Sequence, residues 1–164
     1  MENPIVNEYL KELDAEEEST RRCLERIPSE LSGWKPHERS MEMGYLALLV
    51  AEIPRWISAS IEDSEIDLAT FIHLKPETTQ ELVDYFNSNM ELARNALRKI
   101  NDNDLEDSFS LKRDGQIVFT STKRENISQS VNHLVHHRGQ LTVYMRLNDI
   151  PVPSIYGPSA DERT

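Results

Sequence analysis

The sequence predicts an all-α protein, a four-helix bundle with long crossover connections. Three observations support this fold class. Apolar residues recur at helical spacing in four long segments. Only 5 Gly and 8 Pro interrupt the 164 residues. Long polar connections separate several of the segments, as in bundles with crossovers. Since this length is typical of one domain, we expect a single domain over residues 1–164.

The first two predicted helices lie in the first third of the chain. The first spans about residues 4–27 and ends before Pro28, which cannot continue a helix. The second spans about residues 41–61, with Ser40 as its N-terminal cap. Pro54 lies inside this second helix and should kink it. Its predicted buried face consists of five residues within an arc of about 100°: Leu46, Leu49, Ile53, Trp56 and Ile57.

The second half of the chain contains two more predicted helices with a break in the helical pattern between them. After an irregular acidic crossover over residues 63–75, the third helix begins at Thr78 or Thr79 and runs to about residue 100. Apolar residues then alternate around Asp114-Gly115, which favours a type I′ turn, so we expect a small hairpin or an extended excursion there. The fourth helix spans about residues 123–148, and the proline-rich tail after it should pack as an extended segment over the body.

The composition excludes several classes of partner. The chain has 29 Asp plus Glu against 18 Lys plus Arg, for a formal charge of −11, and an acidic surface repels the phosphate backbone of a nucleic acid. No stretch reaches the roughly 18 apolar residues of a membrane helix, and the acidic first residues lack a signal-peptide pattern. We therefore expect a cytoplasmic protein that binds neither nucleic acid nor membrane.

Two further features are interpreted as structural. The single cysteine, Cys23, excludes an internal disulfide framework and is interpreted as an ordinary helix residue, since no motif places a base beside it. The acidic run over residues 16–18 is interpreted as a solvated helix face, because successive side chains on a helix diverge by about 100°.

Polar residues of the fourth predicted helix form a stripe that should face the protein interior. At 100° per residue, the stripe fills an arc of about 80° flanked by apolar side chains: Ser130, His133, His137, Gln140 and Tyr144. Two histidines at this i, i+4 spacing can hold one metal ion. They can equally be core histidines that hydrogen-bond to Gln140 or Tyr144. His136 lies at the edge of the stripe, and His37 and His73 lie in predicted loops, where both are interpreted as structural.

Five segments of the chain resemble the DinB-like superfamily, also described as YfiT-like metalloenzymes. The strongest likeness is the run NHLVHHRGQLT at residues 132–142, with RLNDIPVP at 146–153 and YGPSAD at 156–161 after it. WKPHERSM at residues 34–41, leading into LALLVAE at 46–52, is similar as well. The resemblance implies a four-helix bundle with crossover connections, commonly a homodimer. It also implies a divalent metal, zinc or nickel, held by three histidines. Characterised relatives include thiol S-transferases that use low-molecular-weight thiols, isomerases and hydrolases.

The chain departs from this family at one metal ligand. His133 and His137 match two of the three histidines, but the third position, on the second predicted helix, holds Leu49. A catalytic zinc site normally has three protein ligands, so two imidazoles need another donor. Glu52, His37 or a residue of the tail are the candidates for that donor, although none has convincing spacing.

Two hypotheses follow, and neither assigns a catalytic residue. In the first, metal binding is impaired or absent, and the chain is a dimeric scaffold or has a small-molecule pocket at Leu49, Gln140 and Tyr144 beside the two histidines. In the second, the protein is a divalent-metal-dependent enzyme, thiol S-transferase-like or hydrolase-like, with a rearranged site. We favour the first, because a leucine offers no lone pair to a metal ion.

Overall fold

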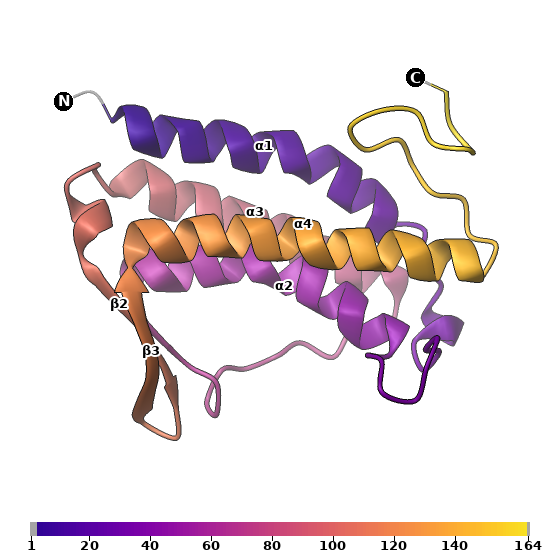
Figure 1. Cartoon of the computed structure of the whole chain (residues 1–164), viewed down its shortest axis with the longest axis horizontal. Helices are drawn as coiled ribbons and strands as arrows, with labels where there is room; N and C mark the ends of the chain where they lie inside the picture. Colours follow the sequence, from indigo (N-terminus) through magenta and orange to yellow (C-terminus); the bar gives the residue numbers. More distant parts are fainter. Residues whose placement is uncertain (1–2, 164) are drawn as a thin grey trace.

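Four long helices carry most of the chain in the computed structural model, which describes residues 3–163 (Figure 1). They are α1 (Pro4–Leu24), α2 (Met43–Glu62), α3 (Thr79–Lys99) and α4 (Lys123–Leu147). Three strands lie between them, β1 (Glu65–Asp67), β2 (Ser108–Arg113) and β3 (Gln116–Thr122). Two short 3₁₀ turns, Ser29–Leu31 and Asp104–Glu106, complete the elements. No helix within the described residues is long and apolar enough to cross a membrane.

Side-chain caps set the start of two helices, one of which was predicted from the sequence. The Thr78 hydroxyl accepts a hydrogen bond from the backbone N–H of Glu81 at 3.1 Å, which confirms the predicted start of α3. Thr122 and Glu125 form a capping box at the start of α4, in which each side chain accepts from the backbone N–H of the other. Two of the four orphan N–H groups of α4 are satisfied in this way.

The predicted Ser40 cap is wrong, because backbone carbonyls of the preceding loop take its place. Helix α2 begins at Met43, whose N–H donates to the Trp34 carbonyl at 2.7 Å. The next N–H, that of Gly44, donates to the Ser32 carbonyl at 2.8 Å. A Cβ on Gly44 would lie 2.8 Å from the Cβ of Ser32, so only glycine permits this approach. A long-range contact of this kind leaves no local sequence signal.

Helix α2 lies at the centre of the core and packs against α3 and α4. Four of its five predicted core residues, Leu46, Leu49, Ile53 and Ile57, are buried. Trp56 is half-buried instead and borders a cavity described below. The helix continues through Pro54 to Glu62, and the kink expected there stays a prediction.

A three-stranded sheet makes the fold mixed, so the all-α prediction is wrong in this part of the chain. Strands β2 and β3 form the expected antiparallel hairpin, with positive φ at Asp114 (52°) and Gly115 (75°). Strand β1 adds in parallel to β2, and the Asp67 carboxylate accepts from the N–H groups of both turn residues at 3.1 and 2.7 Å. Three residues are too few for a period-2 pattern, so β1 leaves no signal in the sequence.

The C-terminal tail is not helical and packs against α1, as predicted, but it bends back on itself instead of running extended, and an ion cluster anchors it (Figure 1). The fully buried guanidinium of Arg138 lies 2.6 Å from the Glu16 carboxylate, and Tyr156 of the tail donates to Glu16 at 2.9 Å. Ser19 and Thr20 accept from the same guanidinium at 2.9 Å. We call these five residues the Arg138 cluster. The interpretation of residues 16–18 as a solvated face is wrong for Glu16, because its partner Arg138 lies 122 positions away in the chain.

Candidate functional site

The predicted histidine stripe of α4 exists as a chain of hydrogen bonds. His137 Nδ1 lies 2.7 Å from Gln140 Oε1, and His137 Nε2 lies 2.7 Å from His133 Nε2. The amide oxygen of Gln140 only accepts, so His137 carries a proton on Nδ1 and donates it to Gln140. Between the two Nε2 atoms one ring donates and the other accepts, and Nδ1 of His133 forms no hydrogen bond with another group of residues 3–163.

The surroundings of His133 favour its neutral form. Burial lowers the pKa of His133 below its ordinary value, and the neighbouring His137 and His136 lower it further because a second positive charge would be repelled. His136 itself is exposed, at the edge of the stripe where the sequence places it.

Another residue of the stripe, Tyr144, forms its hydrogen bond outside this network. Its hydroxyl donates to the Met41 carbonyl at 3.2 Å, and its ring packs edge-on against Trp34 at 5.4 Å between centroids. Tyr144 therefore fixes the loop before α2 to α4, and the hydrogen-bond partner of the histidine pair is Gln140.

The side chains beside the histidine pair do not fit a three-histidine metal site. The third family position, Leu49, is a buried aliphatic side chain of α2. The candidate replacement Glu52 is already bound by His73 and Tyr85, and His37 lies in an exposed loop where its Nδ1 accepts from Arg39 N–H at 3.1 Å. Across residues 3–163, no three His, Cys, Asp or Glu side chains converge in a way that could hold a metal ion.

A cavity of 310 Å³ lies between His133, at one end of the hydrogen-bonded stripe, and the small sheet. We call this cavity the sheet pocket. Seven apolar side chains from α2, the sheet and the connection after β1 line it: Trp56, Ile66, Leu68, Phe71, Phe109, Leu111 and Phe119. Five polar side chains complete the wall: His73, Asn126, Gln129, Ser130 and His133. None of the twelve is Asp, Glu, Lys or Arg, although these four types make up 29% of the chain.

Two of the lining residues contain buried hydrogen-bond donors that nothing in the described chain satisfies. They are the indole Nε1 of Trp56 and the amide Nδ2 of Asn126. Since buried donors are normally paired, an acceptor from outside the chain would complete them. Of the predicted stripe, His133 and Ser130 line the sheet pocket, whereas Leu49, His137, Gln140 and Tyr144 do not.

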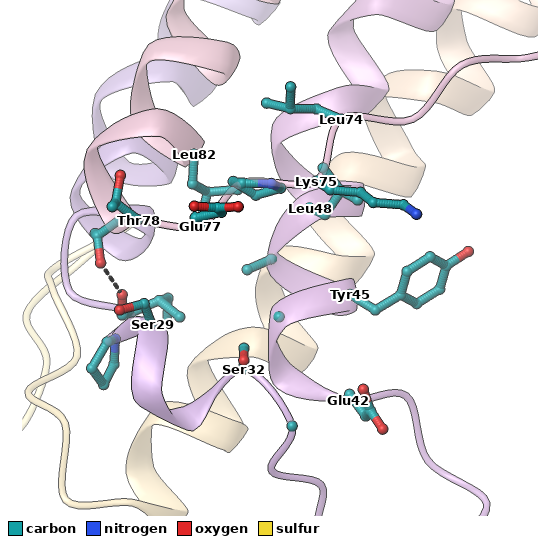
Figure 2. Close-up of a pocket in the computed structure, with 17 residues that line it drawn as sticks. Ser29, Ser32, Glu42, Tyr45, Leu48, Leu74, Lys75, Glu77, Thr78 and Leu82 are labelled. Atoms are coloured by element: carbon teal, nitrogen blue, oxygen red, sulfur yellow. Dashed lines mark hydrogen bonds between the residues drawn. The ribbon is translucent and has the colours of Figure 1, made fainter.

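A second cavity, of 360 Å³, has a different character. It lies between the start of α2 and the start of α3 (Figure 2), and its wall includes the charged residues Glu42, Lys75 and Glu77. Thr79, also in its wall, donates to the Ile27 carbonyl at 2.7 Å. This hydrogen bond joins α3 to the end of the first helical segment, so its role is structural.

The single cysteine takes no part in either cavity. Cys23 is fully buried in the core, and burial raises the pKa of its thiol to about 11. A thiol with this pKa stays protonated near neutral pH and is a poor nucleophile. Its interpretation as an ordinary helix residue is confirmed.

Sequence reasoning missed two polar residues beside the sheet pocket, Glu52 as a buried carboxylate and His73 as a pocket residue. His73 lies in a connection without periodicity, and its partner Glu52 is 21 positions away. The one available signal was an acidic residue inside the otherwise apolar run at residues 46–54, since carboxylates are rarely buried without a partner.

Comparisons with solved structures show the class of fold. The chain is similar to a DinB-like protein from Bacillus cereus ATCC 10987, with a TM-score of 0.70 and 23% identity over 90% of this chain and 95% of that one. It is also similar to the DinB-like protein YjoA from Bacillus subtilis, with a TM-score of 0.71 and 16% identity over 90% and 97% of the two chains. At these identities the likeness establishes the fold alone.

The sequence itself shows the family. The model of the DinB family matches residues 1–164, and the chain belongs to this family. A stretch of 32 residues is 53% identical to the uncharacterized protein YrdA of Bacillus subtilis (strain 168). That stretch spans 20% of this chain and 19% of YrdA.

Proposed function

We propose that this protein binds an uncharged, mostly apolar small molecule in the sheet pocket and that binding needs no metal ion. The observation that carries the proposal is the composition of the pocket wall, seven apolar and five polar side chains without one formal charge. A charged ligand entering such a wall would lose its hydration without gaining an ionic partner. An apolar ligand would gain from the same dehydration.

The size and wall of the pocket fit a small organic molecule. A volume of 310 Å³ lies at the lower end of the range for small-molecule sites, which are mostly apolar with a few polar groups that fix orientation. Four of the lining side chains are aromatic, and flat rings favour an aromatic ligand by offset or edge-to-face packing: Trp56, Phe71, Phe109 and Phe119.

The unsatisfied donors of the wall indicate how the ligand is oriented. An acceptor oxygen on the ligand, such as a carbonyl or ether oxygen, would accept from Trp56 Nε1 or Asn126 Nδ2. A buried donor without a partner costs about 1–3 kcal/mol, so satisfying either one would add to affinity.

The retained pair His133 and His137 favours a second candidate, the divalent-metal-dependent enzyme of thiol S-transferase-like or hydrolase-like type. This candidate requires a third donor at the position of Leu49, and Glu52 and His37 are both engaged elsewhere. In the metal-free alternative that we propose, Gln140 and the two imidazoles satisfy one another, and His133 contributes to the pocket wall.

Fluorescence of an uncharged apolar probe, N-phenylnaphthylamine, tests the proposal. We expect saturable binding to the wild-type protein and its loss in Ser130→Leu, which places four heavy atoms of a leucine side chain in the wall where serine has two. The matched control is Ser88→Leu, the same change at an exposed position of α3 outside the sheet pocket. Binding that survives Ser130→Leu, or that Ser88→Leu removes equally, would contradict the proposal.

A further inference from the structure

The Glu52 carboxylate is the one acidic side chain of α2 that is completely buried in the described structure. Both of its oxygens lie close to His73 Nδ1, at 2.8 and 3.0 Å, and the Tyr85 hydroxyl donates to it at 3.2 Å. A buried carboxylate is costly unless donors surround it. These two side chains, which come from separate parts of the chain, supply that environment.

The carboxylate fixes the roles of the two His73 nitrogens. Carboxylate oxygens only accept, so Nδ1 of His73 carries a proton and donates it to Glu52. In the neutral ring Nε2 is then a lone pair, and no other side chain or backbone group of residues 3–163 forms a hydrogen bond with it. Since His73 lines the sheet pocket, Nε2 is the atom it can offer to a ligand.

The connection that carries His73 is held in place by contacts that do not involve a ligand. The His73 ring packs against Phe71 at 5.4 Å between centroids. The guanidinium of Arg55 lies over the Phe71 ring at 4.6 Å and donates to the Ile72 carbonyl at 2.9 Å. The imidazole is therefore oriented before a ligand arrives, which lowers the entropy cost of using it.

We propose that His73, positioned by Glu52, accepts a hydrogen bond at Nε2 from a ligand hydroxyl, so that the sheet pocket selects phenol-like molecules over aromatic molecules without a hydroxyl. The inference rests on the proposed function and names its ligand class. The aromatic wall accounts for the ring of the ligand, and the Nε2 lone pair accounts for the hydroxyl. The anion behind the imidazole strengthens its Nε2 as an acceptor, and acidic hydroxyls such as phenols are the donors that gain most.

The test compares three probes that share one ring and differ only in the group offered to His73. They are para-ethylphenol, its methyl ether para-ethylanisole, and para-ethylbenzoate, each used to displace N-phenylnaphthylamine. We expect the wild-type protein to bind the phenol about threefold to tenfold more tightly than the ether, the ratio that one net hydrogen bond supplies. The benzoate should bind most weakly, since its charge meets no cation in the wall.

Substitutions assign the preference to His73 and Glu52. His73→Phe keeps a ring but removes the acceptor, so the phenol and the ether should bind equally. If His73→Phe does not fold, His73→Trp serves the same purpose, because its indole N–H keeps a donor for the buried Glu52 carboxylate and offers no acceptor. Glu52→Gln removes the charge behind the imidazole and should lower the phenol-to-ether ratio. The control His37→Phe, in an exposed loop, should leave the ratio unchanged.

The outcomes separate this inference from the proposed function. Equal wild-type affinity for phenol and ether, with probe binding intact, overturns the role of His73 alone. Preference for the benzoate also overturns it, because that result requires a positively charged His73. Failure of N-phenylnaphthylamine to bind at all overturns the proposed function together with the inference.

Discussion

Helix α4 contributes to two buried polar networks that differ in what they leave unsatisfied. In the Arg138 cluster, the guanidinium, the Glu16 carboxylate and the Tyr156 hydroxyl are all bonded to one another within the protein. The histidine stripe ends instead at His133, whose Nδ1 has no hydrogen-bond partner in the described chain and whose ring borders a cavity. Buried polar side chains alone therefore do not indicate a binding site, because a network whose groups are all bonded within the protein, here called closed, serves to hold the fold together. A network that is open, with an unpaired polar atom beside a cavity, does indicate a candidate binding site.

The largest expected effect is on the closed network. Arg138→Met leaves the Glu16 carboxylate buried without its cation, which typically costs about 3–5 kcal/mol when one partner of a buried pair is removed. Urea denaturation would show this as a lower midpoint. The control is Arg146→Met, also on α4, which removes an exposed ion pair with Asp161 of the tail and should leave the midpoint nearly unchanged. Equal effects of the two substitutions would show that the Arg138 cluster is not the anchor described here.

The next largest effect is expected at the histidine stripe, where Leu49 occupies the position of the third histidine ligand. Leu49→His should restore a third imidazole near His133 and His137, so that zinc stabilises the variant but not the wild type. At zinc concentrations of 100 times Kd the gain is about 2.7 kcal/mol, measurable as a rise in Tm. Leu48→His, one position along α2, is the matched control. No gain for Leu49→His over the wild type would count against the view that Leu49 is what prevents metal binding.

The fold was largely predictable from sequence, whereas the site was only partly so. Local signals such as the cap at Thr78 and the Asp114-Gly115 turn located α3 and the hairpin, and helical spacing located α4. Strand β1 was missed because it is three residues long and exists only through pairing with β2. The stripe was recognised from helical spacing, and that spacing led to His133.

The missed parts of the site depend on contacts between residues distant in the chain. The ion pair of Glu16 with Arg138 and the hydrogen bond of Glu52 with His73 join separate elements, so neither has a period or a spacing to detect. The prediction placed a pocket at Leu49, Gln140 and Tyr144, none of which lines the sheet pocket. The sheet pocket lies toward the β-strands instead, because the sheet supplies four of the seven apolar residues in its wall: Ile66, Phe109, Leu111 and Phe119.

The smallest effect concerns the tail that closes the Arg138 cluster. Arg26, the Ser154 N–H and Arg22 hold the pKa of the Glu162 carboxyl at about 2, against an ordinary 4.5. A lowered folded-state pKa means that Glu162 stabilises the docked tail fully above pH 4.5 and loses this contribution as the pH falls toward 2. Hydrogen exchange of the Ser154 amide, which donates to Glu162 at 2.9 Å, should show less protection across that window.

The control for the tail is Glu162→Gln, which removes the titrating group. In this variant protection of Ser154 should be lower at neutral pH and should no longer change between pH 4.5 and 2. A pH response of the variant that matches the wild type would assign the effect to another carboxylate, such as Asp161, whose pKa Arg146 also lowers.

The most direct test of the central claim is the binding of N-phenylnaphthylamine before and after the protein is treated with a strong chelator and desalted. A metal-independent sheet pocket predicts the same affinity and the same stoichiometry in both samples, with loss of binding only in Ser130→Leu. Loss of binding on chelation, restored by added zinc or nickel, would contradict the account.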